Sequence, residues 1–508
     1  MKKIDEILNK ITMYRVVLYE LIFLLVVAIV LAFFGFLPYT PAGIFFSAVF
    51  ITTICWLVNK IFAFVFSAPS NPESTYITAL ILALIISPMS GFGDASFFAL
   101  AFWASALAMA SKYILAIGKK HIFNPAAIAV VITAFTLNLS ASWWVGTAVM
   151  FPFVLVGGFL VVRKIHRTDL VWGFIFAALV STLAFSAFSG GNIVTGLIRV
   201  LLSTPLLFFA SVMLTEPLTS PPNVPMQTTF GMLVGFLFAP WVHVGAVYST
   251  PELALVVGNI FAYIVSPKKK LVLTLKEAEQ ISADTYDFIF TPDKSFSFRP
   301  GQYMEWTLSH DRPDSRGIRR YFTLASSPTE RELHLGVKFF ENGSSFKEKM
   351  MKMKIGDKVV ATGLAGSFVL PKDKNKKLVF IAGGIGVTPF RSMIKYLIDT
   401  GDRRAVTMLY SNKTAGDIAY KEIFDTAEKI LGIKTVYALT APDADLSRLP
   451  SAVRKIDSKT IAEKIPDYRD RIFYLSGPRG MVLGFRKTLG SMGIKKENIK
   501  TDFFPGFA

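Results

Sequence analysis

The most informative residues of this chain form a glycine-rich turn in its C-terminal half. An apolar run, Leu378-Val-Phe-Ile-Ala-Gly, has the composition of a buried strand and is followed by Gly384-Ile-Gly-Val-Thr-Pro. Glycines at such a turn allow a tight bend and let the backbone approach a pyrophosphate closely. Thr388 suits the N-cap, and Pro389 the first position, of a helix that we expect to extend through Leu397. The pattern predicts a dinucleotide-binding turn.

A glycine-rich turn alone is weak evidence, but three further segments follow it: Leu409-Tyr-Ser-Asn412, Tyr474-Leu-Ser-Gly-Pro-Arg-Gly-Met481 and Asp502-Phe-Phe-Pro-Gly-Phe507. Their order and spacing resemble the ferredoxin–NADP reductase superfamily. The resemblance implies that Ser476 stands beside the nicotinamide, where many relatives have a cysteine, and that Phe504 lies over the flavin ring. The expected NAD(P)H-binding residues are Gly383, Gly384, Gly386, Thr388, Pro389, Ser411, Gly477, Pro478 and Met481.

Upstream, the segment Arg320-Tyr-Phe-Thr-Leu-Ala-Ser resembles the FAD-binding strand of the same superfamily. An arginine offers a fixed fork of donors for a pyrophosphate. The resemblance places Tyr321 in the FAD site, Phe322 against the flavin, and Thr323 at hydrogen-bonding distance from the reacting edge of the isoalloxazine. Together with Ser476 and Phe504, Thr323 is a candidate catalytic residue. The alternative interpretation is that this motif is an ordinary strand that ends in a turn and binds no cofactor.

A second phosphate contact is expected in the segment Gly343-Ser344-Ser345-Phe-Lys-Glu348. Ser345 and Glu348 have the spacing of a capping box, so we expect a helix to begin there. Free amides and the helix dipole at such a start favour an anion, although many capping boxes bind nothing. The segment Gly363-Leu-Ala-Gly-Ser-Phe368 completes the set of motifs in the superfamily.

These motifs need two kinds of scaffold. After residue 270 the sequence alternates as strands do, as in Tyr286-Asp-Phe-Ile-Phe, and near residue 375 it changes to strands that alternate with helices. We therefore expect an antiparallel β-barrel that binds FAD over residues 268–373 and an α/β nucleotide-binding domain over residues 374–508. A charged linker at Pro371–Lys377 marks their junction.

Residues 1–267 have a different composition and form a third domain. They carry 12 Lys and Arg and 8 Asp and Glu, whereas residues 268–508 carry 42 and 28. The first part therefore has the composition of a lipid-facing bundle, and the second has a net charge of +14. The sequence contains no nucleic-acid-binding module, so we attribute the basic charge to an anionic membrane surface and a dinucleotide.

Ten apolar runs predict a polytopic bundle of about ten helices, since a helix of about 20 residues crosses the hydrocarbon. The runs fall near 16–37, 41–66, 76–88, 95–117, 124–140, 142–162, 170–188, 193–214, 226–245 and 250–266. The runs 76–88 and 124–140 are short and are typical of broken or half-length helices. Such helices are tolerated at membrane depth only when other helices bury them.

The connecting loops show a charge asymmetry. The loops near 38–40, 89–94, 141, 189–192 and 246–249 contain no Lys or Arg. The other side of the bundle receives Lys2, Lys3, Lys10, Arg15, Lys119, Lys120, Arg163, Lys164, Arg167 and Lys268–Lys270. The positive-inside rule therefore predicts a multi-pass protein with both termini and the reductase domain in the cytoplasm. A bacterial or archaeal cytoplasmic membrane is the expected location.

Three polar, proline-bearing segments interrupt the apolar pattern: Asn71–Thr78, Lys119–Ala127 and Thr215–Pro222. Such segments usually line a site, and simple connecting loops are the alternative. Their motifs, above all Phe123-Asn-Pro-Ala, resemble the membrane flavin subunits of the sodium-pumping NADH:quinone reductase and of the Rnf electron-transport complex. The likeness covers about residues 15–266. It implies helices that bind a flavin within the membrane and pass single electrons.

One feature of that family is missing from this chain. Its members attach FMN to a threonine in a Ser-Gly-Ala-Thr-like loop, whereas this chain has Asn138-Leu-Ser-Ala-Ser-Trp-Trp-Val-Gly-Thr147 at the same place. We therefore expect a second flavin, FMN or riboflavin, that is held without a covalent bond. The residues expected to bind it are Ser74, Thr78, Asn124, Thr215 and Thr219.

Other redox centres have few candidate ligands. Cys55 is the single cysteine, so the chain cannot ligate an iron–sulfur cluster by itself, and we expect no metal site. A transmembrane haem reductase needs paired histidines, and residues 1–267 offer only His121, His166 and His243, each in or near a different loop. A redox-driven Na⁺ or H⁺ transporter remains an alternative, with Glu20, Glu73 and Glu216 as its main acidic candidates.

The sequence as a whole predicts an NAD(P)H dehydrogenase that passes electrons through FAD and a membrane flavin to a quinone or an outward acceptor. Further electron-transfer subunits are expected as partners, and nucleic acid is not. We favour NADH slightly over NADPH, because only Lys413 offers a positive charge after the Tyr410–Asn412 strand end. Arg454 and Lys455 would reverse this preference if they folded back to a 2′-phosphate.

Overall fold

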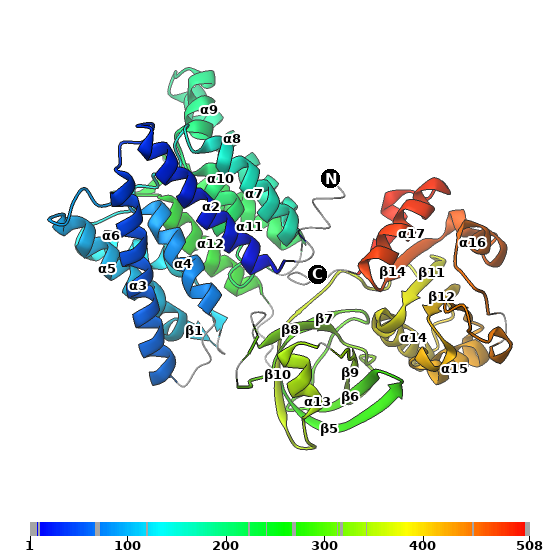
Figure 1. The fold of residues 1–508 in the computed structure, drawn as a ribbon. Helices are drawn as coiled ribbons and strands as arrows, with labels where there is room; N and C mark the ends of the chain where they lie inside the picture. The colour runs from blue at the N-terminus through cyan, green and yellow to red at the C-terminus, as the bar shows by residue number, and fades with distance from the viewer. Residues whose placement is uncertain are drawn as a thin grey trace. The chain divides into compact units, whose positions relative to one another are not determined.

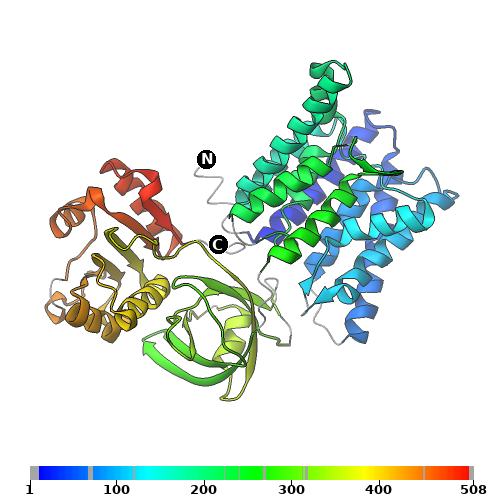
Figure 2. The ribbon, with the colours of Figure 1, turned by 180° about the vertical axis from the view of Figure 1, so that it is seen from behind.

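The structure is a computed structural model of the 508-residue chain. It describes residues 8, 11–66, 72–117, 120–221, 224–239, 241–266, 271–311, 313–314, 318–341, 343–449 and 452–502. The chain forms two compact units, a helical unit up to Ser266 and a mixed unit from Pro267 to Phe504. Figures 1 and 2 show both units from opposite sides.

Four helices of the first unit are long and apolar enough to cross a membrane: α2 (Met13–Phe33), α3 (Pro41–Val65), α5 (Ala95–Ile114) and α8 (Thr168–Phe188). A fifth candidate is broken. It joins α9 (Ile193–Leu202) to α10 (Leu206–Phe208) and the π-helix η1 (Phe209–Met213), with a bend of 57° between its two parts. These assignments rest on length and composition within the described residues.

The other helices are shorter: α4 (Pro72–Ile85), α6 (Pro125–Leu137), α7 (Phe151–Ile165), α11 (Val224–Leu237) and α12 (Pro251–Val265). Two small hairpins accompany them, β1–β2 (Ala116–Ile117 and Lys120–His121) and β3–β4 (His243–Val244 and Val247–Tyr248). Each of the ten predicted runs therefore contains a helix. That all ten cross a membrane remains a prediction.

The run 142–162 is not helical throughout, because α7 begins only at Phe151. The residues before it satisfy the C-terminal end of the half-length helix α4. The Ile85 carbonyl accepts hydrogen bonds from the amides of Ser142 and Trp143, both at 2.9 Å, and the Trp144 indole donates to the carbonyls of Ala83 and Ile86 at 3.0 Å. A helix that ends at depth needs such partners, since lipid offers none.

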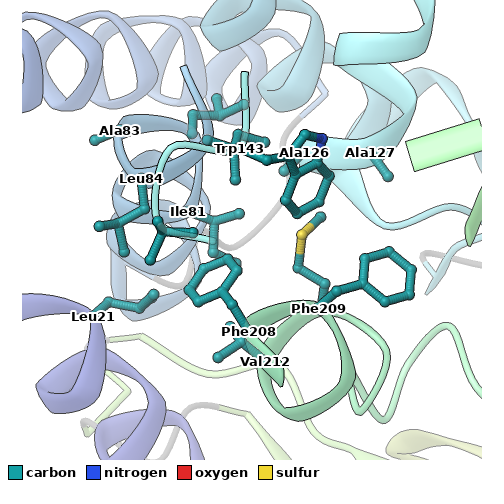
Figure 3. Packing of buried hydrophobic residues seen from close by; sticks show 14 of the residues in the cluster. Leu21, Ile81, Ala83, Leu84, Ala126, Ala127, Trp143, Phe208, Phe209 and Val212 are labelled. Atoms are coloured by element: carbon teal, nitrogen blue, oxygen red, sulfur yellow. The ribbon is translucent and has the colours of Figure 1, made fainter. Parts of the chain in front are cut away.

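Both short helices lie inside the bundle. Figure 3 shows how α4 and α6 pack with η1 and the Trp143 loop, through the labelled residues Leu21, Ile81, Ala83, Leu84, Ala126, Ala127, Trp143, Phe208, Phe209 and Val212. Most residues of α4 after Thr78 are fully buried. Their burial agrees with the expectation that half-length helices sit among other helices.

The second unit begins with a six-stranded antiparallel sheet. Its strands are β5 (Leu271–Ser282), β6 (Thr285–Pro292), β7 (Tyr303–Thr307), β8 (Arg319–Thr323), β9 (Leu333–Lys338) and β10 (Lys358–Ala365), in the order β8-β7-β10-β5-β6-β9. The short helix α13 (Ser345–Met351) packs on it through Phe346 and Met350. The pairing leaves β8 and β9 at the two ends, so closure of this sheet into a barrel remains a prediction.

A five-stranded parallel sheet follows. Its strands are β11 (Leu378–Gly383), β12 (Val406–Asn412), β13 (Lys434–Leu439), β14 (Ile472–Ser476) and β15 (Ile499–Thr501), in the order β13-β12-β11-β14-β15. The central strand β11 is buried along its whole length. Successive strands leave β11 first on one side and then on the other, so the topological switch point lies between β11 and β14.

Helices cover both faces of the parallel sheet, as Figure 1 shows. They are α14 (Thr388–Thr400), α15 (Lys421–Leu431), α16 (Ser458–Lys464) and α17 (Arg479–Ser491). Phe380 of β11 packs with residues of α14 and α15, whereas its neighbour Ile381 packs with residues of α16 and α17. The period of two in a strand therefore explains why β11 is apolar at every position.

Candidate functional site

The two glycine-rich motifs meet at the carboxyl edge of the parallel sheet. Ala382 is in register with Ser476, and Gly383 is in register with Ser411. A Cβ atom on Gly386 would lie 2.5 Å from the backbone nitrogen of Gly477. The turn after β11 and the turn after β14 are therefore in backbone contact at the switch point, where open α/β sheets bind their ligands.

Side chains from the start of α17 close the other side of this contact. A Cβ atom on Gly383 would lie 2.8 Å from Met481 Cε and 3.1 Å from Pro478 Cδ. Gly477 has a φ of +150°, and a Cβ atom on it would lie only 3.0 Å from the Cα of Gly383. The absence of side chains exposes backbone amides in the turns, which is the arrangement that a pyrophosphate needs. The residues present thus fit a dinucleotide.

The start of α14 differs from the expectation by one residue. Gly384–Val387 form a 3₁₀ turn, Val387 is the N-cap, and Thr388 is already helical. The Thr388 hydroxyl donates to the Ile385 carbonyl at 3.3 Å instead of capping an amide. Pro389 remains within the first turn, where its missing amide proton costs nothing. The predicted N-cap role of Thr388 was therefore wrong.

Ser476 is buried at the end of β14, and its hydroxyl donates to Oδ2 of Asp502 at 3.2 Å. The Asp502 amide in turn donates to the Leu475 carbonyl at 3.0 Å. Ser476 is thus fixed next to the Gly383–Gly477 contact. Phe504, the residue expected over the flavin, lies outside the described residues, so its role stays a prediction.

The predicted FAD strand is the edge strand β8. Arg320 is buried, and its guanidinium lies 3.5 Å from Oδ1 of Asp314. The other oxygen of Asp314 accepts a hydrogen bond from the backbone amide of Ser345 at 3.1 Å. The guanidinium and the first amide of α13 therefore converge on one carboxylate. Both donors bind an oxygen anion here, so they fit a pyrophosphate that takes the place of the Asp314 carboxylate.

The cap of α13 is Ser344 and not Ser345. Its hydroxyl accepts a hydrogen bond from the Lys347 amide at 3.3 Å, and Ser345 is the first helical residue. The Ser345 hydroxyl instead accepts from the Asp314 amide and bonds His310 Nε2, both at 2.9 Å. The predicted Ser345–Glu348 capping box was therefore wrong.

The rest of β8 presents its side chains alternately. Tyr321 and Thr323 share one face, where Thr323 is buried opposite Tyr303 and the Tyr321 hydroxyl donates to Glu305 Oε2 at 2.9 Å. Phe322 packs against Phe346 of α13, with ring centroids 5.9 Å apart. Arg320 and Phe322 thus both contact Phe346 of α13. Which of these side chains touch FAD stays a prediction.

A buried network that the sequence did not reveal joins the two sheets of this unit. Tyr420 donates to Asp287 Oδ1 at 3.0 Å, and Nδ1 of His334 lies 2.7 Å from the other oxygen of Asp287. Arg391 of α14 binds both oxygens of Glu330, with one N–O distance of 2.9 Å, and donates to the Ala325 carbonyl at 3.1 Å. These contacts fix the antiparallel sheet against the parallel one.

In the helical unit, the polar residues meet around the Glu216 carboxylate. Oε1 of Glu216 lies 3.0 Å from Nε2 of His121, and Oε2 accepts hydrogen bonds from Asn124 at 2.9 Å and Thr219 at 3.2 Å. Asn259 of α12 accepts from the Asn124 amide at 2.8 Å and donates to the Thr219 carbonyl at 3.0 Å. The structure thus brings the predicted residues Asn124 and Thr219 together.

The other predicted residues of the membrane site, Ser74, Thr78 and Thr215, make no hydrogen bond to the Glu216 carboxylate among the described contacts. The Lys112 ammonium donates to the carbonyl and the hydroxyl of Ser74 at 2.9 and 3.1 Å, and it interacts electrostatically with Glu216. The hydroxyls of Thr78 and Thr215 donate to carbonyls of their own helical turns. Lys112 was not among the predicted site residues. A charged residue within the otherwise apolar run 95–117 was the signal that could have identified it.

Comparison with known proteins identifies the second unit. Residues 272–370 match the oxidoreductase FAD-binding domain, and residues 380–487 match the oxidoreductase NAD-binding domain. The C-terminal half is an FAD- and NAD-binding reductase. The prediction that this half binds FAD and a nicotinamide dinucleotide is confirmed, whereas the roles of the individual motif residues stay predictions. The resemblance of residues 15–266 to membrane flavin subunits has no such support and stays a prediction.

Curated relatives of the reductase half include flavohemoproteins and the reductase component of an oxygenase. A flavohemoprotein of Pseudomonas putida is 26% identical over 234 residues, which make up 45% of this chain and 58% of that protein. The reductase component of propane 2-monooxygenase from Mycolicibacterium goodii is 26% identical over 218 residues, 41% of this chain and 60% of that protein. The chain therefore spans about three fifths of the length of these relatives.

Two solved structures are similar over the same region. The cytochrome P450 reductase of Amycolatopsis shares 24% identity and a TM-score of 0.42, over 47% of this chain and 71% of that one. The FAD- and NAD-binding domain of the nitric oxide dioxygenase of Vibrio cholerae shares 23% identity and a TM-score of 0.40, over 47% and 99%.

Proposed function

We propose that this protein is a membrane-bound NAD(P)H dehydrogenase that passes electrons from NAD(P)H through FAD to a second flavin in the helical unit, and from there to a quinone or an outward acceptor. The observation that carries the proposal is the contact between Gly386 and Gly477 at the switch point, in the same unit as the Arg320 strand. One scaffold thus holds a dinucleotide turn beside donors for a second pyrophosphate.

The residues of the reductase divide the task between binding and orientation. The backbone of Gly383, Gly386 and Gly477 receives the pyrophosphate of NAD(P)H, and Arg320 with the Ser345 amide receives that of FAD. Ser476, held by Asp502, orients the nicotinamide, and Thr323 offers a hydroxyl to the flavin edge. When bound, FAD accepts a hydride as two electrons and can return electrons one at a time.

The buried network between the sheets keeps these two sets of residues in register. Burial raises the pKa of the Tyr420 hydroxyl well above its ordinary value, so the phenol stays a hydrogen-bond donor to Asp287 over the working pH range. Hydride transfer needs reacting atoms about 3–3.5 Å apart, so a small shift between the sheets would slow the reaction. We assign Tyr420 and Arg391 as positioning residues for this reason.

The helical unit supplies the second redox site of the proposal. The Glu216 group gathers amide, hydroxyl and imidazole side chains within an apolar bundle, and such groups recognise the polar edge of a flavin. A bilayer about 30 Å thick is too wide for direct electron transfer from a cytoplasmic FAD, so an intermediate carrier is needed. Substitution Asn124→Leu should remove the second flavin and leave the FAD content unchanged. A full flavin content in that variant would refute this placement.

We infer a bacterial or archaeal cytoplasmic membrane as the location, with the reductase in the cytoplasm where NAD(P)H is found. The preference for NADH follows from the sparse positive charge after β12, where Lys413 is exposed. Arg454 is engaged by the Ala441 carbonyl at 2.9 Å. Comparison of kcat/KM for NADH and NADPH tests this point, and a tenfold preference for NADPH would overturn it.

A direct test of the function is NADH oxidation by the full-length protein in proteoliposomes that contain a quinone. We expect the quinone to be reduced, and the substitution Gly386→Ala to slow the reaction at low NADH concentrations by weakening NADH binding. Reduction of water-soluble dyes alone, with no quinone reduction, would contradict the electron path.

A redox-driven ion transporter is the second candidate function, because Glu20 and Glu216 place carboxylates inside the bundle. Uptake of Na⁺ or H⁺ by the same vesicles on addition of NADH distinguishes this function from a plain reductase.

A further inference from the structure

The helical unit contains a buried carboxyl group, that of Glu20, which the electron path above does not use. Glu20 lies on the buried face of α2, between Val17 and Leu21, and is 8% exposed. It is the eighth residue of a helix that begins at Met13, so it lies about 10 Å along the helix axis. This position is inside the apolar part of α2 and not at its end.

Glu20 differs from the other glutamates that the structure describes in this unit. Glu73 pairs with Arg15, Glu216 has three side-chain partners, and Glu252 accepts a hydrogen bond from the Trp143 indole at 2.9 Å. The carboxyl group of Glu20 has no hydrogen bond or ion pair with any described residue, and its Oε1 is fully buried. Glu20 is therefore the exception that needs an explanation.

The bundle is shaped to hold this carboxyl group. It packs directly on Gly157 of α7, where the Cβ of any other residue would overlap both carboxyl oxygens. The next residue, Gly158, packs in the same way against Ser211 of η1, because a Cβ there would lie 2.6 Å from the serine hydroxyl. A pair of adjacent glycines thus accommodates two polar side chains, one from α2 and one from the π-helix.

The surrounding helices bring no charge to Glu20. Of the helices packed on α2, α3 contributes Cys55, which bonds the Ser105 carbonyl, and Lys60, which lies over Trp56. The charged residues of the other two are Glu73 on α4, paired with Arg15, and Arg163 and Lys164 in the last turn of α7. Among the described residues, no ion pair or hydrogen bond joins any of these side chains to Glu20.

A carboxylate without a partner is strongly disfavoured in an apolar interior, so the group must bind something positive. A metal cation such as Ca²⁺ or Mg²⁺ needs about six oxygen ligands, and Glu20 faces glycine and apolar side chains. Only a proton can be held by one carboxyl group. Because a single carboxyl group is present, the positive ligand of Glu20 is a proton and not a metal cation.

We propose that Glu20 is a reversible proton-binding site of the bundle, neutral at pH 7, which releases and rebinds its proton as electrons pass through the helical unit. Release breaks the O–H bond, leaves a carboxylate and passes the proton to the second flavin of the proposed function, whose reduction takes up a proton. Rebinding of a proton from water restores the acid, and the carboxyl group itself is neither oxidised nor reduced. The coupling to electrons rests on the proposed function, whereas the neutral state of Glu20 does not.

A row of polar side chains extends along the segment that follows Ser211, which packs on Gly158 beside the Glu20–Gly157 contact. Ser211 and Thr215 carry hydroxyls one helical turn apart, and the Thr215 hydroxyl donates to the Ser211 carbonyl at 2.7 Å. Glu216 and its partner His121 follow directly. Because π-helical turns interrupt the regular hydrogen-bond ladder, they are frequent at functional sites. This segment leads from the neighbourhood of Glu20 to the Glu216 group, which holds groups that can exchange a proton.

The neutral state is tested by dicyclohexylcarbodiimide, which modifies carboxyl groups only when they are protonated and lie in an apolar environment. The full-length protein in lipid nanodiscs is treated between about pH 5 and pH 8, and peptides are quantified by mass spectrometry, since an ordinary glutamate has a pKa of about 4.3. We expect Glu20 to be modified at pH 7, and Glu20→Gln to lose this label. An unmodified Glu20 at pH 7, in a peptide that is otherwise detected, would overturn the proposal.

The coupling is tested by infrared difference spectra of the full chain before and after reduction by NADH. We expect a band of a protonated carboxyl group to change on reduction and to be absent in Glu20→Gln. The matched variant Glu252→Gln should keep the band, because Glu252 has its own partner in Trp143. A Glu20 band that stays constant while both flavins are reduced would overturn the coupling. Failure of NADH to reduce any flavin would instead refute the proposed function.

Discussion

The contact between the two glycine-rich turns predicts a specific defect for Gly386→Ala. The new methyl group would lie 2.5 Å from the Gly477 nitrogen and 2.7 Å from the Ser476 carbonyl carbon. Comfortable contacts between heavy atoms are about 3.5–4.0 Å, so the turns must separate by about 1 Å. Both partners are backbone atoms at the ends of paired parallel strands, and they cannot rotate away as a side chain would.

The magnitude follows from the cost of overpacking a tight site, which is about 1–3 kcal/mol. If this free energy is lost from the conformation of the turns that binds NADH, the affinity for NADH drops roughly five- to 150-fold. The proposed FAD site at β8 and α13 shares no residue with this contact, so the FAD content of the variant should equal that of the wild type. The defect should therefore be one of NADH binding and not of FAD loading.

Anaerobic stopped-flow measurement of FAD reduction separates the two effects, because the dependence of the rate on NADH concentration gives the dissociation constant. Gly484→Ala is the matched control: it makes the same change within α17, at a place where a Cβ meets nothing within 4 Å. It should leave binding unchanged and stabilise the helix by about 0.5–1 kcal/mol. An affinity for NADH within twofold of wild type in Gly386→Ala would refute the described contact.

Three further predictions concern other parts of the reductase. Arg320→Ala should strongly lower FAD occupancy, measured as flavin released per chain, whereas normal occupancy would exclude the arginine from the site. Tyr420→Phe removes a buried hydrogen bond to Asp287, so it should lower the free energy of unfolding by about 1–3 kcal/mol and slow FAD reduction at saturating NADH; an unchanged rate would show that the network only stabilises. Hydrogen bonds from Arg471 and Lys377 lower the pKa of Asp467 to about 2 in the folded chain. The Asp467 carboxylate therefore stabilises the fold fully above the unfolded pKa of about 3.9, and this stabilisation is lost as the pH falls through 2. Asp467→Asn should therefore lower the melting temperature slightly at pH 7 and not at pH 2, a small effect because the pair is partly exposed; equal losses at both pH values would contradict this origin.

The sequence was sufficient for the dinucleotide turn because its residues are dictated by backbone geometry. Gly383, Gly386 and Gly477 lack side chains since their neighbours leave no space, and this requirement is visible as a motif. The network of Tyr420 and Arg391 left no such signal, because its partners come from distant segments that only the fold brings together. Asn259 was missed in the helical unit for the same reason.

Two local errors have physical causes of their own. Ser344 and Ser345 are both good N-cap residues, so spacing alone could not decide which one begins α13. Residues 142–150 are apolar enough to resemble a membrane span, but hydropathy does not reveal that they form the partners of the buried end of α4. The number of spans that cross the membrane is a prediction that hydropathy and helix length leave open.

The central claim is that electrons pass from FAD to a second flavin among the helices. The most direct test counts flavins released by acid from the full-length protein and from a truncated chain that begins at Lys268. A band of fluorescent flavin should not survive denaturing electrophoresis, because neither flavin is covalently attached. The account predicts about two flavins per full-length chain and about one in the truncated chain, since the helical unit holds its own cofactor. One flavin in both proteins would contradict it.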